Sequence, residues 1–127
     1  MGAVVNAAQA VQAWLSSFGI PAYAAAAVPS DTPWPYLTYE LVVGEWLGGE
    51  VNMPVNLWYH GDSEAAPNAK ARELYDDIGM GGRLLPCDGG SLWVKRGSPW
   101  CQSVFVEGED EHVKRRYINV NIEYLVS

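Results

Sequence analysis

The chain has 127 residues, including six Trp and seven Tyr, and its formal net charge at pH 7 is −7. This length suits one domain over residues 1–127, because domains commonly span about 100–150 residues, and a hydrophobic content of 49% excludes a disordered chain. The net charge excludes a free-standing DNA- or RNA-binding protein, because neutralising phosphates requires clustered Lys and Arg. A small core hides few Trp side chains, so we expect about two or three of the six on a surface used for association.

The charge is unevenly distributed along the chain. Residues 1–69 carry six acidic residues and no Lys or Arg, whereas residues 70–127 carry nine acidic and eight basic residues. We therefore expect one end or face of the fold to be acidic. Such a surface repels nucleic acid, and inside a pore it would let DNA pass without sticking.

The first half of the chain predicts two helices and a hairpin. Apolar residues spaced three or four apart predict a helix over residues 3–18, ended by Gly19. The type of structure over residues 23–28 stays open, and a proline-rich loop then holds Trp34 at the surface. Strands are predicted at 36–43 and 51–59, and a second helix at 63–78.

The last third predicts strands. They cover residues 83–86, 91–95 and 100–107, with a turn at 96–99 and a charged loop at 107–116. Residues 117–126 alternate between apolar and polar side chains, the period of a strand with one buried face. The elements together predict an α+β fold with about five or six mostly antiparallel strands and two helices packed on them.

Catalytic and metal-binding patterns are weak. A metal site could use residues of the types that ligate zinc, but these lack the close pairs that such sites employ: His60, Asp62, Cys87, Cys101 and His112. Cys101 could act as a nucleophile with His112 as its base, but a predicted strand lies between them, so the sequence does not place them within hydrogen-bond reach. Asp76 and Asp77 are adjacent on a helix and point about 100° apart, so they cannot act as one pair, and a solvated helix face explains them better. We expect neither enzymatic activity nor a cofactor. Whether Cys87 and Cys101 form a disulfide stays open.

The loop at 107–116 places four acidic residues before three basic ones. This order would suit identical subunits packed head to tail, where the acidic residues of one subunit meet the basic residues of the next. A solvated, unpaired loop is the alternative.

Five features, taken in chain order, resemble the tail terminator family of long-tailed bacteriophages, and the resemblance covers most of the chain. They are the N-terminal helix, Trp-Pro-Tyr-Leu-Thr-Tyr-Glu at 34–40, Asn-Leu-Trp-Tyr at 56–59, the helix at 63–78, and Arg-Arg-Tyr-Ile-Asn-Val-Asn-Ile-Glu-Tyr-Leu at 115–125. The last is the most specific, because these proteins commonly end on a strand of the form basic-aromatic-x-Asn-x-x-x-Glu-Tyr. The charged loop departs from the family, since it is short for an arm that inserts into the tail tube.

The resemblance implies an α+β subunit of a hexameric ring in the neck of the virion, assembled in the host cytoplasm. The ring would stop polymerisation of the tail tube and join the tail to the head. Its partners would be other copies of itself, the tail tube protein and a head-completion or connector protein. Genomic DNA would pass through the ring without specific binding, and no membrane is involved.

Exposure expected in turns and loops assigns candidate residues to this function. Contacts with neighbouring subunits or the tube are predicted for Trp46, Trp100, Glu109, Asp110, Arg115 and Arg116. An acidic lumen is predicted for Glu45 and Glu50. The alternatives are another neck protein, such as a head-completion or stopper protein, a small binding module, or a small metal-dependent hydrolase.

Overall fold

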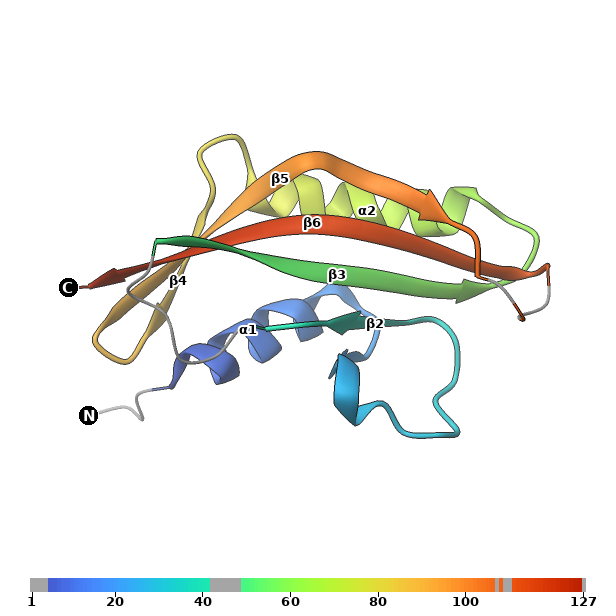
Figure 1. Ribbon diagram of the computed structural model, residues 1–127, viewed down its shortest axis with the longest axis horizontal. Helices are drawn as coiled ribbons and strands as arrows, with labels where there is room; N and C mark the ends of the chain where they lie inside the picture. Colours follow the sequence, from blue (N-terminus) through green and yellow to red (C-terminus); the bar gives the residue numbers. More distant parts are fainter. Residues whose placement is uncertain (1–4, 42–48, 107, 109–110, 127) are drawn as a thin grey trace.

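The structure, a computed structural model, describes residues 5–41, 49–106, 108 and 111–126 (Figure 1). Within these residues, two α-helices and six strands form the fold, with 3₁₀ turns at Ser16–Phe18 and Ala25–Ala27. The elements are α1 (Ala7–Leu15), β1 (Ala22–Ala24), β2 (Tyr36–Tyr39), β3 (Glu50–His60), α2 (Ala65–Ile78), β4 (Arg83–Cys87), β5 (Gly90–Val104) and β6 (Val113–Val126).

The strands form one sheet in the order β1-β2-β3-β6-β5-β4. β1 and β2 are parallel, and all other neighbours are antiparallel. The long strands β3, β5 and β6 curve together through the middle of the molecule (Figure 1). The predicted α+β class, with a mostly antiparallel sheet and two helices, is confirmed.

Both helices pack on one face of the sheet, which we call the helix face. Residues that alternate along the two central strands point to it: Val55 of β3 lies opposite Ile118 of β6, and both are fully buried. Leu15 of α1 and Leu74 of α2 belong to the same apolar core. The intervening residues of each strand point to the opposite face, which we call the outer face, and neither helix covers it.

The helices begin and end where the capping residues allow. Asn6 Oδ1 accepts the N–H of Gln9 at 2.8 Å, and Gln9 Oε1 accepts the N–H of Asn6 at 2.9 Å, a capping box that starts α1. Gly19 follows the 3₁₀ turn after α1 with φ +85°, so the predicted stop is confirmed. α2 starts two residues later than predicted, with Ser63 Oγ accepting the N–H of Ala65 at 3.1 Å.

The predicted turn at 96–99 is wrong. β5 runs through it without reversing, since Arg96 lies opposite Val120 of β6 and Cys101 lies opposite Ile118. The glycine and proline that suggested a turn instead form a bulge that takes up the extra residues of β5. A Cβ at Gly97 would lie 2.6 Å from the Asn119 carbonyl oxygen, so glycine permits this close approach.

Other segments also differ from the prediction. The open stretch at 23–28 contains the end of β1 and a 3₁₀ turn, and β2 ends at Tyr39. β1 is an edge strand, because it pairs only with β2. β6 begins at Val113, so Lys114, Arg115 and Arg116 belong to a strand and the predicted exposed loop is wrong for them. In the described part of the chain, no helix has the length and apolar character needed to cross a lipid bilayer.

Candidate functional site

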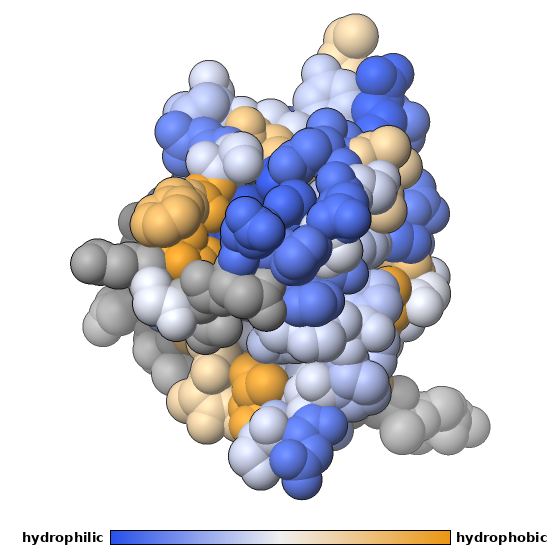
Figure 2. All heavy atoms as spheres, turned by 90° about the vertical axis from the view of Figure 1, so that its right-hand side faces the viewer, coloured by the Kyte–Doolittle hydropathy of each residue, from blue (hydrophilic) through white to orange (hydrophobic). Residues whose placement is uncertain are grey.

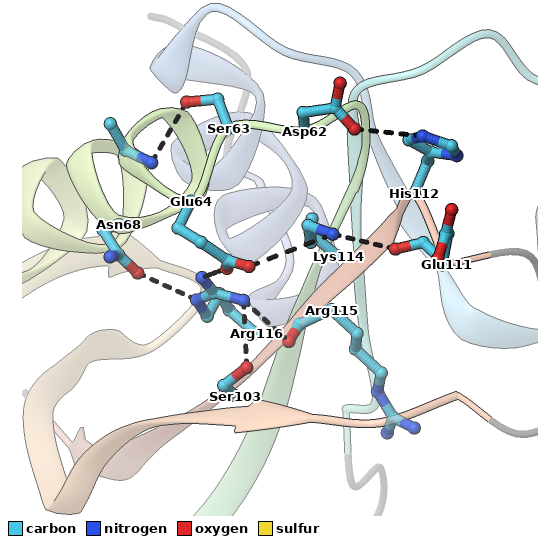
Figure 3. Close-up of polar contacts among 11 residues, drawn as sticks. Asp62, Ser63, Glu64, Asn68, Ser103, Glu111, His112, Lys114, Arg115 and Arg116 are labelled. Atoms are coloured by element: carbon cyan, nitrogen blue, oxygen red, sulfur yellow. Dashed lines mark hydrogen bonds and ion pairs between the residues drawn. The ribbon is translucent and has the colours of Figure 1, made fainter.

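The start of β6 lies at one end of the sheet, beside the loop that leads into α2. The space-filling view of this end shows hydrophilic side chains gathered next to a small apolar patch (Figure 2). In the close-up, Arg115 and Arg116 leave the strand in opposite directions (Figure 3). Adjacent residues of a strand point to opposite faces of the sheet, so the two arginines lie on different faces.

Arg116 points to the helix face and is only 3% exposed. Its Nε donates to Asn68 Oδ1 of α2 at 2.9 Å, and its Nη1 donates to Ser103 Oγ of β5 at 3.2 Å. Its Nη2 pairs with the carboxylate of Glu64, which immediately precedes α2 (Figure 3). A buried guanidinium thus joins β6, β5 and α2.

Glu64 is held as an anion by this network. The hydrogen bond from Arg116 lowers the pKa of the Glu64 carboxyl below its ordinary value, and the partial burial of the carboxyl opposes that effect. The charges of Arg116 and Lys114 lower the pKa further. Lys114 Nζ lies 3.9 Å from Glu64 Oε2.

A groove of about 650 Å³ runs between α2 and β5, with the Arg116 network at one end of it. We call it the α2–β5 groove. It is lined by Glu64, Asn68, Ala71, Arg72, Tyr75, Trp100, Cys101, Ser103 and Arg116. Its aromatic wall is fixed, because Trp100 Nε1 donates to the Ala71 carbonyl at 3.3 Å and its ring meets that of Tyr75 edge-on, with centroids 5.5 Å apart.

Cys101 lies half-buried in this groove, and burial raises the pKa of its thiol above the ordinary value. A raised pKa keeps the group as a thiol at neutral pH, and the thiolate is the nucleophilic form. Cys101 and Cys87 are both free, so the disulfide left open by the sequence is absent.

Arg115 points to the outer face, where it joins an aromatic cluster. Its Nε donates to Asn56 Oδ1 at 2.7 Å, and its guanidinium lies 5.1 Å from the centre of the Trp58 ring. Trp58 Nε1 donates to Thr38 Oγ1 at 3.0 Å, which fixes the indole. The cluster continues through stacked or tilted rings to the edge of the sheet and includes Tyr23, Trp34, Tyr36, Trp58 and His60.

Trp34 is 41% exposed, as its proline-rich loop predicted. His60 lies against both Trp34 and His112, with ring centroids 5.6 and 5.8 Å away. His112 Nε2 lies 3.0 Å from Asp62 Oδ1 (Figure 3). Three residues of the weak metal pattern therefore gather here, but no group of three or more His, Cys, Asp or Glu in the described residues could hold a metal ion.

An ion-pair cluster lies towards the opposite end of the outer face. Lys95 Nζ of β5 contacts Glu50 Oε1 at 2.7 Å and Glu123 Oε1 at 2.9 Å, and it lies 3.8 Å from the centre of the Trp93 ring. The hydrogen bonds that Lys95 Nζ donates to Glu50 and then to Glu123 raise the pKa of Lys95 above its ordinary value. Glu50 begins β3 and does not lie in a turn, and its charge is balanced by Lys95.

The structure separates the residues that the sequence grouped together. Trp100 and Arg116 meet in the α2–β5 groove, Arg115 belongs to the outer face, and Glu50 lies with Lys95. The expectation that Arg116 is exposed is wrong, because it bonds within the subunit. Glu45, Trp46, Glu109 and Asp110 lie outside the described residues.

Sequence reasoning missed several residues of these surfaces. Glu64, Asn68 and Ser103 complete the Arg116 network, but the sequence gave no signal that they meet, because Glu64 and Asn68 lie at the start of α2 and Ser103 lies far along the chain in β5. Asp77 was expected on a solvated face; instead its two oxygens accept Trp14 Nε1 at 2.7 Å and Arg83 Nη1 at 2.8 Å.

In comparisons with known proteins, no protein-family model and no curated protein matches this chain.

Proposed function

We propose that this protein is a structural tail terminator of a long-tailed bacteriophage. Its subunits form a ring on the last ring of the tail tube and cover the surface to which the next tube subunit would add. The opposite side of the ring receives the head-completion or connector protein. The mechanism is steric, and the protein acts in the neck of the virion.

The observation that carries the proposal concerns β6. The segment with the most specific resemblance to the family lies in this strand, which pairs with β3 on one side and β5 on the other. Its apolar residues build the core, and its polar residues Arg115, Tyr117, Asn119, Asn121 and Glu123 occupy the outer face. A central strand of this kind gives a ring subunit a rigid frame together with a face that no helix of its own covers.

Exposed aromatic and apolar side chains support association. Phe105 is 86% exposed at the end of β5, and Trp34 is 41% exposed near the other edge of the outer face. Aromatic side chains are enriched at protein–protein contact surfaces relative to the rest of a protein surface. They are consistent with a subunit that buries more surface when it assembles.

The proposed lumen rests on the acidic first half of the chain. We propose that Glu45 and Glu50 contribute to a wall that DNA crosses without adhering. Lys95 pairs with both Glu50 and Glu123, so that cluster keeps a net negative charge, which repels phosphates. Replacing both with Gln is expected to lower infectivity by slowing the passage of DNA, with assembled tails present in normal number. Asp76→Asn on α2 is the control, and unchanged infectivity of the double variant would refute the lumen assignment.

Native mass tests the main proposal. Light scattering over a concentration series, with negative-stain images, is expected to show a six-subunit annulus, or a monomer that forms one only when tail tube protein is added. Tubes capped by the ring should stop growing when more tube protein is supplied. A stable monomer or dimer that neither forms rings nor caps tubes would contradict the proposal and favour another neck protein or a small binding module.

A further inference from the structure

The α2–β5 groove carries positive charge in an acidic protein. Four cationic side chains lie in it or against it: Arg72 and Arg116 line it, Arg96 stacks on Tyr75 with its guanidinium 3.3 Å from the ring centre, and Lys114 lies beside Glu64. Among the described residues, Glu64 and Asp76 are the carboxylates that pair with these side chains. The balance of these described charges is therefore positive, whereas the whole chain has a net charge of −7.

Arg72 is the cation most available to a partner. Its side chain is 73% exposed, and its ion pair with Asp76, one helical turn away, is exposed as well. Exposed pairs of this type contribute little because solvent screens them. A second carboxylate can therefore approach Arg72 at small cost.

The groove also offers an apolar wall that is already in place. Trp100, Tyr75 and Ala71 form it, with the indole N–H of Trp100 satisfied by the Ala71 carbonyl. Because these aromatic side chains are already ordered, binding a large side chain against them costs no further conformational entropy of the wall. The ligand that suits the groove is a peptide segment with an aromatic anchor followed by acidic residues.

This chain contains such a segment just after β5. Phe105 is 86% exposed, and four acidic residues follow it at positions 107, 109, 110 and 111. The exposure of Phe105 shows that its ring is not held in the groove of its own subunit. The groove and the segment are complementary in both apolar character and charge, so a second copy of the chain is the matching partner.

We propose that the α2–β5 groove binds the segment 105–111 of a second copy, with Phe105 against Trp100 and Tyr75 and the acidic residues towards Arg72. The inference rests on the proposed function, for which it supplies the contact between ring subunits. The sequence analysis expected the acidic residues of one subunit to meet the basic residues of the loop at 107–116 in the next subunit. In the present proposal they meet the cations of the α2–β5 groove instead, and Arg115 on the outer face takes no part.

The first experiment compares the native masses of three variants. Phe105→Ser removes the anchor, and Arg72→Glu reverses the charge at the groove; both side chains are largely exposed, so the fold should be retained by circular dichroism. Met80→Ser is the matched control, because Met80 is 97% exposed and does not line the groove. Phe105→Ser and Arg72→Glu should fail to form rings, and Met80→Ser should assemble as the unmodified protein does. Rings of normal mass from both test variants would overturn the inference and leave the proposed function standing.

The second experiment measures the groove directly and does not depend on ring formation. A synthetic peptide of residues 103–112 is titrated calorimetrically into the Phe105→Ser protein, whose groove is free. We expect binding that is weakened about tenfold by Arg72→Glu in the protein, or by Phe105→Ser in the peptide. Absence of binding, or binding that ignores both changes, would overturn the inference. Binding by a protein that neither forms rings nor caps tubes would support the groove contact while contradicting the tail terminator function.

Discussion

Glu64 and Arg116 form an ion pair that joins the residue before α2 to the start of β6, across 52 positions of sequence. The pair is asymmetric in its surroundings, because the Arg116 side chain is 4% exposed and the Glu64 side chain is 58% exposed. Breaking the pair therefore costs free energy mainly because the buried Arg116 guanidinium, and the groups that accept its hydrogen bonds, cannot turn to water instead.

Arg116→Met should lower the free energy of unfolding by about 1–2 kcal/mol, because the hydrogen bonds to Asn68 and Ser103 are lost while the side-chain stem still fills its site. Urea denaturation measures this change. Arg72→Ala is the control, since that guanidinium is largely exposed and its loss should alter stability little. Equal stability of Arg116→Met and the unmodified protein would contradict the structural role of the network.

The Glu64 pair predicts a pH dependence with a definite sign. The pKa of the Glu64 carboxyl is lowered in the folded protein from an ordinary value of 4.5, so folding favours the ionised form. This contribution is present above pH 4.5 and is lost as the pH falls through the lower folded-state pKa. Glu64→Gln should be less stable than the unmodified protein at neutral pH, and the gap in urea midpoint should close in acid. A gap that stays constant with pH would show that the charge is unimportant.

Asp77 ties α1 and β4 to the end of α2 through its two oxygens. Asp77→Ala should cost about 1–2 kcal/mol, because Trp14 is 4% exposed and its indole N–H would lose its acceptor. Asp76→Ala is the matched control on the same helix, where the partner Arg72 is exposed, and should change stability by less than about 0.5 kcal/mol. Thermal or urea unfolding of the two variants should separate them clearly, and equal losses would refute the assignment.

Gly90 begins β5 against the end of β6. A Cβ there would lie 1.9 Å from the Leu125 carbonyl oxygen, which is part of the backbone and cannot rotate away. Gly90→Ala should therefore lower stability by about 3 kcal/mol through overpacking. Gly81→Ala is the control, since an added Cβ there meets nothing within 4 Å. Similar melting temperatures for the two variants would contradict the register of β5 and β6.

Elements with local sequence signals could be predicted from the residues alone. The alternation at 117–126 predicted β6 and its buried face, the three-and-four spacing predicted α1, and Gly19 marked the end of the first helix. These features follow from the period of each backbone conformation and from the φ values that glycine tolerates. They were sufficient for the α+β class and the mostly antiparallel sheet.

Contacts between residues far apart in the sequence became visible with the three-dimensional structure. The glycine and proline at 97–99 carry the same local signal in a turn and in a bulge, and pairing with β6 on both sides made the segment a bulge. The sequence predicts Arg116 in a charged loop, but β6 begins at Val113 and includes it. Because side chains alternate between the two faces of a strand, Arg116 points to the helix face, where it contacts Glu64 and Asn68. Asp77 of α2 accepts a hydrogen bond from Trp14 of α1, because both helices pack on the helix face of the sheet. Each of these outcomes depends on the register between strands and on helix packing, which short stretches of sequence do not specify.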